Sequence, residues 1–77
     1  MMLEYIPLAK YPLLAQLRDR RKAQGLIIDE LAEEIGVSPT ILGQWERGVR
    51  APTFFNLCAW VQALDLELSL GPKEKGA

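Results

Sequence analysis

The feature that most constrains this chain is a pair of short helical patterns joined by a turn at a glycine. The first pattern reads Glu-Leu-Ala-Glu-Glu-Ile and ends at Gly36, and the second reads Leu-Gly-Gln-Trp-Glu-Arg and ends at Gly48. A short helix, a tight turn and a second helix hold one exposed helix face at a fixed angle. That is the geometry required to enter the major groove of DNA.

The composition bounds both the size of the fold and the classes of function. The chain has 77 residues, of which 49% are hydrophobic, and this is enough for one small core. We expect a single domain over residues 1–77, with its core at 12–65, a strand at 66–70 and a tail at 71–77. One cysteine and no histidine exclude an internal disulfide and remove most metal sites and the commonest general base. An enzyme is therefore not expected, and neither is a metal or another cofactor.

The sequence shows no signal for a membrane. No apolar run reaches the roughly 20 residues that span a bilayer, and no basic leader precedes an apolar segment near Met1. A cytoplasmic, nucleoid-associated location is the resulting expectation.

Four helices are expected, each with identifiable ends. Pro12 suits the start of the first helix, which ends near Gly25, and the second helix covers residues 29–35. Ser38 caps the third helix and Thr53 the fourth, because a hydroxyl oxygen accepts from the free N–H groups of a first turn. The residues expected to face the core on the four helices are Leu13, Leu14 and Leu17; Leu31, Ala32 and Ile35; Leu42 and Trp45; and Phe54, Leu57, Cys58, Val61 and Leu64.

The last part of the chain changes from a helical period to an alternation. Leucine recurs at every second position from Leu64 to Leu70, with a polar residue in each gap, which predicts a strand. A lone strand leaves its backbone N–H and C=O groups unpaired, and the only other candidate strand in the chain is residues 2–6. We expect Leu66, Leu68 and Leu70 to lie in a ribbon shared with a second copy of the chain. A helical turn or a loop over the core remains the alternative.

Several motifs lie at the spacing of a known family. They are Gly25-Leu26, Asp29-Glu-Leu-Ala32, Ile35-Gly-Val-Ser38, Trp45-Glu-Arg-Gly48, Pro52 and Leu57. Together they resemble the helix-turn-helix family of the Cro and phage repressors, the XRE type, over residues 13–65. Residues 53–57 and 64–70 resemble more narrowly the HipB-type antitoxins. The resemblance implies an all-α, lambda-repressor-like domain of four helices, with a C-terminal β-strand that pairs across a dimer.

The resemblance also implies which residues contact DNA, with the third helix as the reader of bases. The groove-facing positions are Pro39, Thr40, Gly43 and Gln44. Gln44 can offer an acceptor and a donor to one base edge, with adenine as its best partner, and Thr40 can bond to a base or touch a thymine methyl. The phosphate contacts are expected from Arg47, Arg50, the free N–H groups at Thr53, and Lys22.

Two further features follow from comparison with the family pattern. Arg21 matches the position that pairs with the glutamate of the Trp-Glu-Arg-Gly motif, so we expect an ion pair between Arg21 and Glu46. Ile27 and Ile28 depart from the pattern, because a Ser or Thr followed by Gln is usual there and isoleucine cannot hydrogen-bond. Either Ile27 pins the entry to the second helix as an apolar staple, or this edge has lost DNA affinity or packs on a protein.

Charge is the feature least typical of a DNA-binding domain. The net charge is −1, whereas such domains are usually basic. The charges are polarised, since residues 1–25 carry five basic and two acidic side chains and residues 26–38 carry four acidic ones only. Opposite charges on different faces of the domain would explain this, and so would an ordinary solvated surface.

Two classes of function remain in view. The first is a sequence-specific DNA-binding transcriptional regulator, an autorepressor or a type II antitoxin. Its partners would be a palindromic double-stranded operator, a second copy in a homodimer and, for an antitoxin, a cognate toxin. The second is a protein-interaction module that kept the scaffold and lost DNA binding. The acidic net charge and the departure from the family pattern at Ile27-Ile28 favour this alternative.

Overall fold

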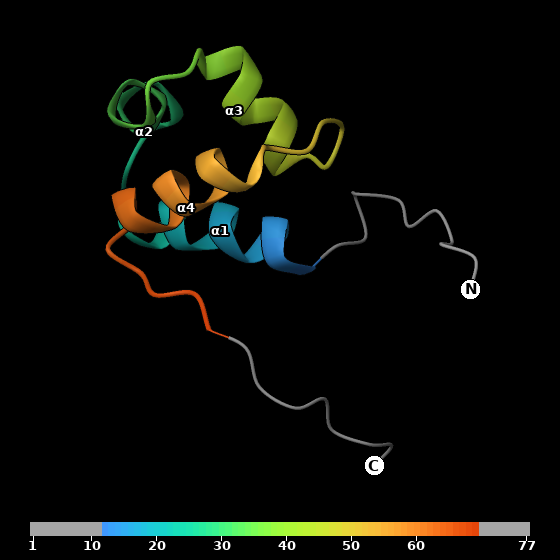
Figure 1. Ribbon diagram of the computed structural model, residues 1–77. Helices are drawn as coiled ribbons and strands as arrows, with labels where there is room; N and C mark the ends of the chain where they lie inside the picture. Colours follow the sequence, from blue (N-terminus) through green and yellow to red (C-terminus); the bar gives the residue numbers. More distant parts are fainter. Residues whose placement is uncertain (1–11, 70–77) are drawn as a thin grey trace, which may run out of the picture.

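The computed structural model describes residues 12–69, which form four α-helices. The helices are α1 (Pro12–Ala23), α2 (Ile28–Ile35), α3 (Pro39–Glu46) and α4 (Phe54–Ala63). In the view of Figure 1, α2 and α3 lie above α1 and α4, and α2 and α3 are joined by a short turn. Helix α2 packs against both α3 and α4, and α3 also packs against α1. The predicted all-α, lambda-repressor-like domain of four helices is confirmed.

One hydrophobic core joins all four helices. It consists of Leu14, Leu17, Leu31, Ala32, Leu42, Trp45, Trp60, Val61 and Leu64, all of them almost fully buried. The rings of Trp45 on α3 and Trp60 on α4 meet at a centroid distance of 5.6 Å and are tilted by 34°. Aromatic pairs prefer such offset or tilted arrangements, so this contact fixes α3 on α4 by shape as well as by buried area.

The starts of α3 and α4 follow the capping prediction. The Ser38 hydroxyl accepts from the N–H of Ile41 at 3.1 Å, and the Thr53 hydroxyl accepts from the N–H of Asn56 at 3.1 Å. Pro39 occupies the first turn of α3, where a missing N–H costs nothing. Both caps are confirmed, and each fixes the residue at which a helix begins.

Helices α3 and α4 end in the same way, with a residue in the left-handed conformation. After α3, Gly48 has φ of 74°, and the N–H of Val49 donates to the Gln44 carbonyl at 2.9 Å. After α4, Asp65 has the left-handed conformation that Gly48 has after α3, with φ of 60°, and the N–H of Leu66 donates to the Val61 carbonyl at 3.0 Å. Aspartate tolerates this conformation better than most residues.

The core face of α4 differs from the predicted one. Phe54 is 77% exposed and Cys58 is half-buried, whereas Trp60, absent from the predicted stripe, is fully buried. Leu57 packs against the core, and Val61 and Leu64 belong to it, as expected. The predicted stripe for α4 was therefore rotated too far toward Phe54 and Cys58, because the large ring of Trp60 moves the centre of the buried face to its own side.

The residues after α4 do not form a strand within the single chain that the structure describes. Leu64 caps α4, and the left-handed Asp65 interrupts the alternation, so Leu64 belongs to the helix end. Residues 66–69 have no regular secondary structure; Leu66 packs against the core and Leu68 is 43% exposed. Leu70, the third residue of the predicted dimer contact, lies outside the described residues. The strand shared with a second copy therefore stays a prediction.

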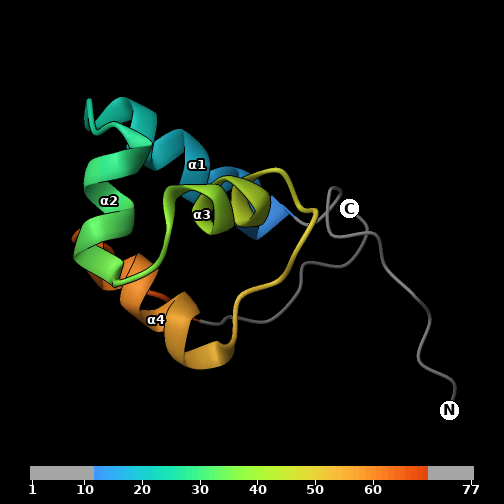
Figure 2. The ribbon, with the colours of Figure 1, turned by 90° about the horizontal axis from the view of Figure 1, so that it is seen from above.

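The view from above shows how the helices are arranged around α3. In Figure 2, α2 and α3 lie in front of α1 and α4, with α2 at one side, and the connection from α3 to α4 runs along the edge of the domain. None of the helices in the described part of the chain is long and apolar enough to cross a membrane.

Candidate nucleic-acid interface

Helix α3 presents two opposite faces. At about 100° of turn per residue, Leu42 and Trp45 point toward the core, while Thr40 and Arg47 point almost directly away from it. The outward arc covers about 140° and is made by Pro39, Gly43, Arg47, Thr40 and Gln44, in that angular order. Pro39, Thr40 and Arg47 are exposed, as a groove-reading face requires.

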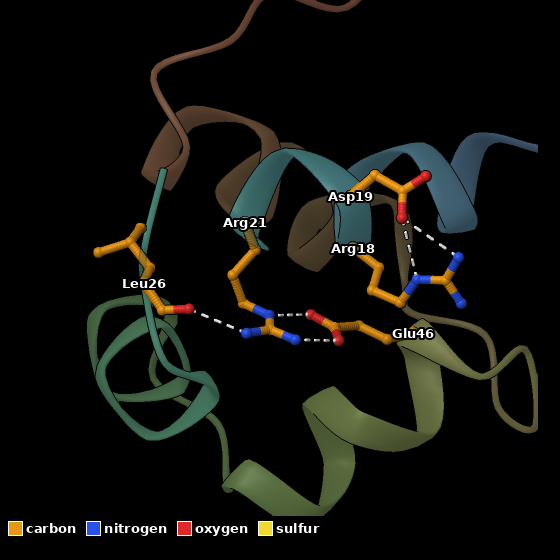
Figure 3. A network of polar contacts seen from close by, with 5 residues as sticks. All are labelled: Arg18, Asp19, Arg21, Leu26 and Glu46. Carbon is orange, nitrogen blue, oxygen red and sulfur yellow. Dashed lines mark hydrogen bonds and ion pairs between the residues drawn. The ribbon is translucent and has the colours of Figure 1, made fainter. Parts of the chain in front are cut away.

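The predicted pair between Arg21 and Glu46 is present and joins α1 to the end of α3 (Figure 3). The Arg21 Nε donates to Glu46 Oε2 at 2.7 Å, and its Nη2 donates to Glu46 Oε1 at 3.0 Å. The third nitrogen, Nη1, donates to the Leu26 carbonyl at 2.9 Å. One guanidinium thus ties α1, the turn before α2 and α3 together.

The pair between Arg21 and Glu46 is largely shielded from solvent, which strengthens its hold on α3. The Arg21 side chain is 12% exposed and that of Glu46 is 5% exposed. The hydrogen bond and the charge of Glu46 raise the pKa of Arg21 above its ordinary value, against the lowering effect of partial burial. A forked contact between a guanidinium and a carboxylate is the strong form of an ion pair, so it restrains the end of α3 against α1.

Gln44 is half-buried, and its side-chain Oε1 is enclosed without a hydrogen-bond partner. A buried acceptor without a partner costs about 1–3 kcal/mol, so the side chain gains by turning toward any donor that approaches. The Gln44 Oε1 can therefore accept from a base edge only after a rotation of the side-chain amide.

Gly43, predicted to face the groove, is buried beneath two neighbouring side chains. A Cβ atom placed on Gly43 would lie 3.3 Å from Nη1 of Arg47 and 3.6 Å from Cδ1 of Ile28. The Arg47 guanidinium thus lies back along α3 and borders the place that a Cβ at position 43 would take.

The loop after α3 carries the predicted phosphate contacts. The Gln44 carbonyl accepts from the N–H groups of Val49 at 2.9 Å and Arg50 at 3.3 Å, so the loop is held on the end of α3. Arg50 is exposed there, and Thr53 begins α4 a few residues later. Lys22 is also exposed, near the end of α1.

The start of α2 lacks a polar cap. Ile27 is in the N-cap position, makes no side-chain capping bond and is 57% exposed. It is therefore not packed as an apolar staple, and that interpretation was wrong. Ile28 instead contributes the apolar contact at this edge, against Gly43 of α3.

Sequence reasoning missed two contacts that position the site. The Gln24 Nε2 donates to the Leu64 carbonyl at 2.7 Å, which joins the end of α1 to the end of α4. The Trp60 ring supports Trp45 from behind α3. The spacing of three residues between Leu57 and Trp60 on one helix was the sequence signal that could have predicted the contact between Trp60 and Trp45. The described residues contain no group of three or more side chains suited to hold a metal ion.

A family model for the helix-turn-helix matches residues 17–70. The chain belongs to the helix-turn-helix family. The resemblance to the XRE type, drawn from the motifs above, is thereby confirmed. A curated relative, an uncharacterized HTH-type transcriptional regulator of Sinorhizobium fredii, is 39% identical over 59 residues. Those residues are 77% of this chain and 30% of the relative, so the chain spans less than a third of that protein's length.

Solved structures of similar helix-turn-helix proteins share the fold. The P22 c2 repressor, solved with a synthetic operator, is 33% identical with a TM-score of 0.67, over 71% of this chain and 83% of that one. The restriction-modification controller protein C.AhdI from Aeromonas hydrophila is 34% identical with a TM-score of 0.68, over 74% and 92%. HipB in the HipA-HipB-O2-O3 complex is 22% identical with a TM-score of 0.75, over 96% and 100%, a likeness of fold alone.

Proposed function

We propose that this protein is a sequence-specific DNA-binding transcriptional regulator that places α3 in the major groove. The observation that carries the proposal is the outward arc of α3, held at a fixed angle by the forked contact between Arg21 and Glu46. Membership of the helix-turn-helix family and the similarity to a repressor solved with its operator support it. Family and fold are those of binding proteins, so no catalytic step is proposed. A chromosomal partner would put the protein in the cytoplasm, at the nucleoid.

The contacts divide into base readers and phosphate binders. Thr40 and Gln44 supply the polar groups that read base edges, and Pro39 sits against the groove wall without hydrogen bonds. Arg50, Lys22 and the free N–H groups at the start of α4 neutralise or bind phosphates. Phosphate contacts position the protein, and the few base contacts set its sequence preference.

The regulator acts on a palindromic operator as a homodimer. Two copies related by a two-fold axis present two α3 helices to successive major grooves, about 34 Å apart. We propose that Leu66 and Leu68, with Leu70, form the shared ribbon. Autorepression is the simplest role of such a protein, and similarity of fold to HipB extends the proposal to an antitoxin with a cognate toxin.

Truncation tests the shared ribbon. A chain that ends at Asp65 should be monomeric by mass measurement in solution and should bind its operator more weakly than the full chain. A truncated chain that stays dimeric with undiminished binding would exclude the ribbon and place the dimer contact elsewhere.

The second candidate function is a protein-interaction module on the same scaffold. The observation that favours it is the start of α2, where exposed Ile27 stands beside the acidic first-turn residues Asp29 and Glu30. Carboxylates repel phosphates, so this edge contributes nothing to DNA affinity.

A salt series separates the two functions. Binding to mixed duplexes should weaken steeply as salt rises if phosphates are neutralised, because each contact releases counterions. Selection from a random duplex pool should then return a palindrome with two half-sites. A flat salt dependence and no enriched sequence would favour the interaction module.

A further inference from the structure

We propose that Arg47 reads a guanine in the major groove, and that Gly43 provides the space that Arg47 needs to do so. The family resemblance predicts Arg47 as a phosphate contact. The proposal gives this side chain a different role, the recognition of a base. The inference rests on the proposed function, since it names a specificity-determining residue for the same DNA interface.

The first observation is the place of the Arg47 guanidinium. Its Nη1 lies 3.3 Å from where a Cβ of Gly43 would be, which is closer than side-chain carbons normally come to a neighbour. Residues four apart on a helix are neighbours on one face, so Arg47 lies back along α3 over Gly43. A Cβ at position 43 would require the guanidinium to shift by a few tenths of an ångström from this place.

The second observation is the direction of that face. Arg47 follows directly after α3, keeps a right-handed helical backbone with φ of −87° and ψ of −4°, and so continues the turn of the helix. It lies near the middle of the outward arc, between Gly43 and Thr40, and almost opposite Leu42 and Trp45. Although Arg47 follows the last residue of α3, its guanidinium lies back at the level of Gly43, on the face that an inserted α3 would turn toward the base edges.

The third observation is the surroundings of the charge. Within residues 12–69, no carboxylate pairs with Arg47, in contrast to Arg21 and Arg18, which bind Glu46 and Asp19. The Cδ1 of Ile28 lies 3.6 Å from the same Cβ position and carries no acceptor. In the part of the chain that the structure describes, no side chain forms an ion pair with Arg47, so its donors are open to an external acceptor.

The chemistry of that acceptor follows from the donor. A guanidinium has two parallel N–H groups that match O6 and N7 of guanine, which is the commonest specific contact in the major groove. Gln44 next to it prefers adenine. We therefore infer that each half-site contains one guanine read by Arg47, adjacent to the base pair read by Gln44.

The experiment selects bound duplexes from a random pool with the full-length wild type and with Arg47→Ala, Arg47→Lys and Gly43→Ala. Wild type should enrich one guanine per half-site. Arg47→Ala should lose that preference by roughly 5- to 150-fold and keep the preference at the other positions. Arg47→Lys should also lose most of it, because lysine keeps the charge without the fork. Gly43→Ala should reduce the same preference while Arg47 is intact; alanine favours the helix, so the domain stays folded.

Arg50→Ala is the matched control, since it removes a nearby arginine expected on a phosphate. It should weaken all duplexes about equally and lower the salt slope by about one unit. If Arg47→Ala behaves like Arg50→Ala, or Arg47→Lys keeps the full guanine preference, Arg47 is a phosphate contact and the inference is overturned. An unchanged preference in Gly43→Ala would overturn the role of Gly43. Wild type that binds no duplex would overturn the proposed function as well, so the two failures are distinguishable.

Discussion

The inner and outer faces of α3 obey different constraints, although the helix has only eight residues. On the inner face, Leu42 and Trp45 are almost fully buried, and Glu46 makes both bonds of a forked ion pair. On the outer face, Thr40 is exposed, and the neighbouring Arg47 is tied to no carboxylate in residues 12–69. The difference separates two tasks: the side chains that hold the fold lie on the inner face, and the side chains proposed to contact DNA lie on the outer face.

The largest effect should come from breaking the inner ion pair. Arg21→Ala or Glu46→Ala leaves the partner buried and uncompensated, which costs about 3–5 kcal/mol of folding free energy. The measurement is denaturant unfolding of each variant. Arg18→Ala is the control, because its exposed pair with Asp19 at 3.2 Å is worth at most about 1 kcal/mol. Equal losses in all three variants would mean that the buried pair does not hold α3.

A core truncation on the same face should cost almost as much. Leu42 is fully buried, so Leu42→Ala removes its contacts and leaves a cavity, with an expected loss of about 2–5 kcal/mol. Thr40→Ala, on the outer face of the same helix, should change the free energy of unfolding by about 0.5 kcal/mol or less. Thermal melts of the two variants compare the faces directly, and a large loss in Thr40→Ala would contradict their separation.

On the outer face, Gln44→Ala should change binding rather than stability. We expect it to remove about 1–3 kcal/mol of discrimination at one base pair in each half-site. Its unfolding should be unchanged or slightly more favourable to the native state, since an enclosed oxygen without a partner is removed. Competition binding with single-base variants of the selected site measures the first effect. Unaltered discrimination would show that α3 does not read that base.

The smallest effect should come from the start of α3, which both faces share, at the Ser38 cap. Ser38→Ala removes the bond to the Ile41 N–H and should cost about 1 kcal/mol. Ser38→Asn, which keeps an acceptor, is the control and should retain most of the stability. Calorimetric melts of both variants test this. A loss in Ser38→Asn equal to that in Ser38→Ala would assign the effect to some other property of serine.

Local chemistry in the sequence determined the starts of α3 and α4, and the motif spacing determined the family. Ser38 and Thr53 are capping residues wherever they precede a helical pattern, and Gly48 ends α3 because left-handed backbone suits glycine. The motif spacing predicted the Arg21–Glu46 pair through resemblance, although these residues are 25 positions apart. Such features depend on neighbours in the chain or on a pattern shared by a family, so one sequence is enough to find them.

Tertiary packing decided what periodicity alone could not. The buried face of α4 is centred on Trp60 and leaves Phe54 exposed, because Trp60 is the largest side chain of the helix and its burial removes the most apolar surface from water. Arg47 came to lie over Gly43 beside Ile28, a meeting of two helices and a loop that no local pattern specifies. The alternating leucines after α4 have no strand within residues 12–69, because a strand forms only where a partner supplies its hydrogen bonds. The sequence thus determined where α3 and α4 begin, because their caps are local, and the tertiary structure decided which side chains α3 exposes, because exposure depends on what the other helices cover.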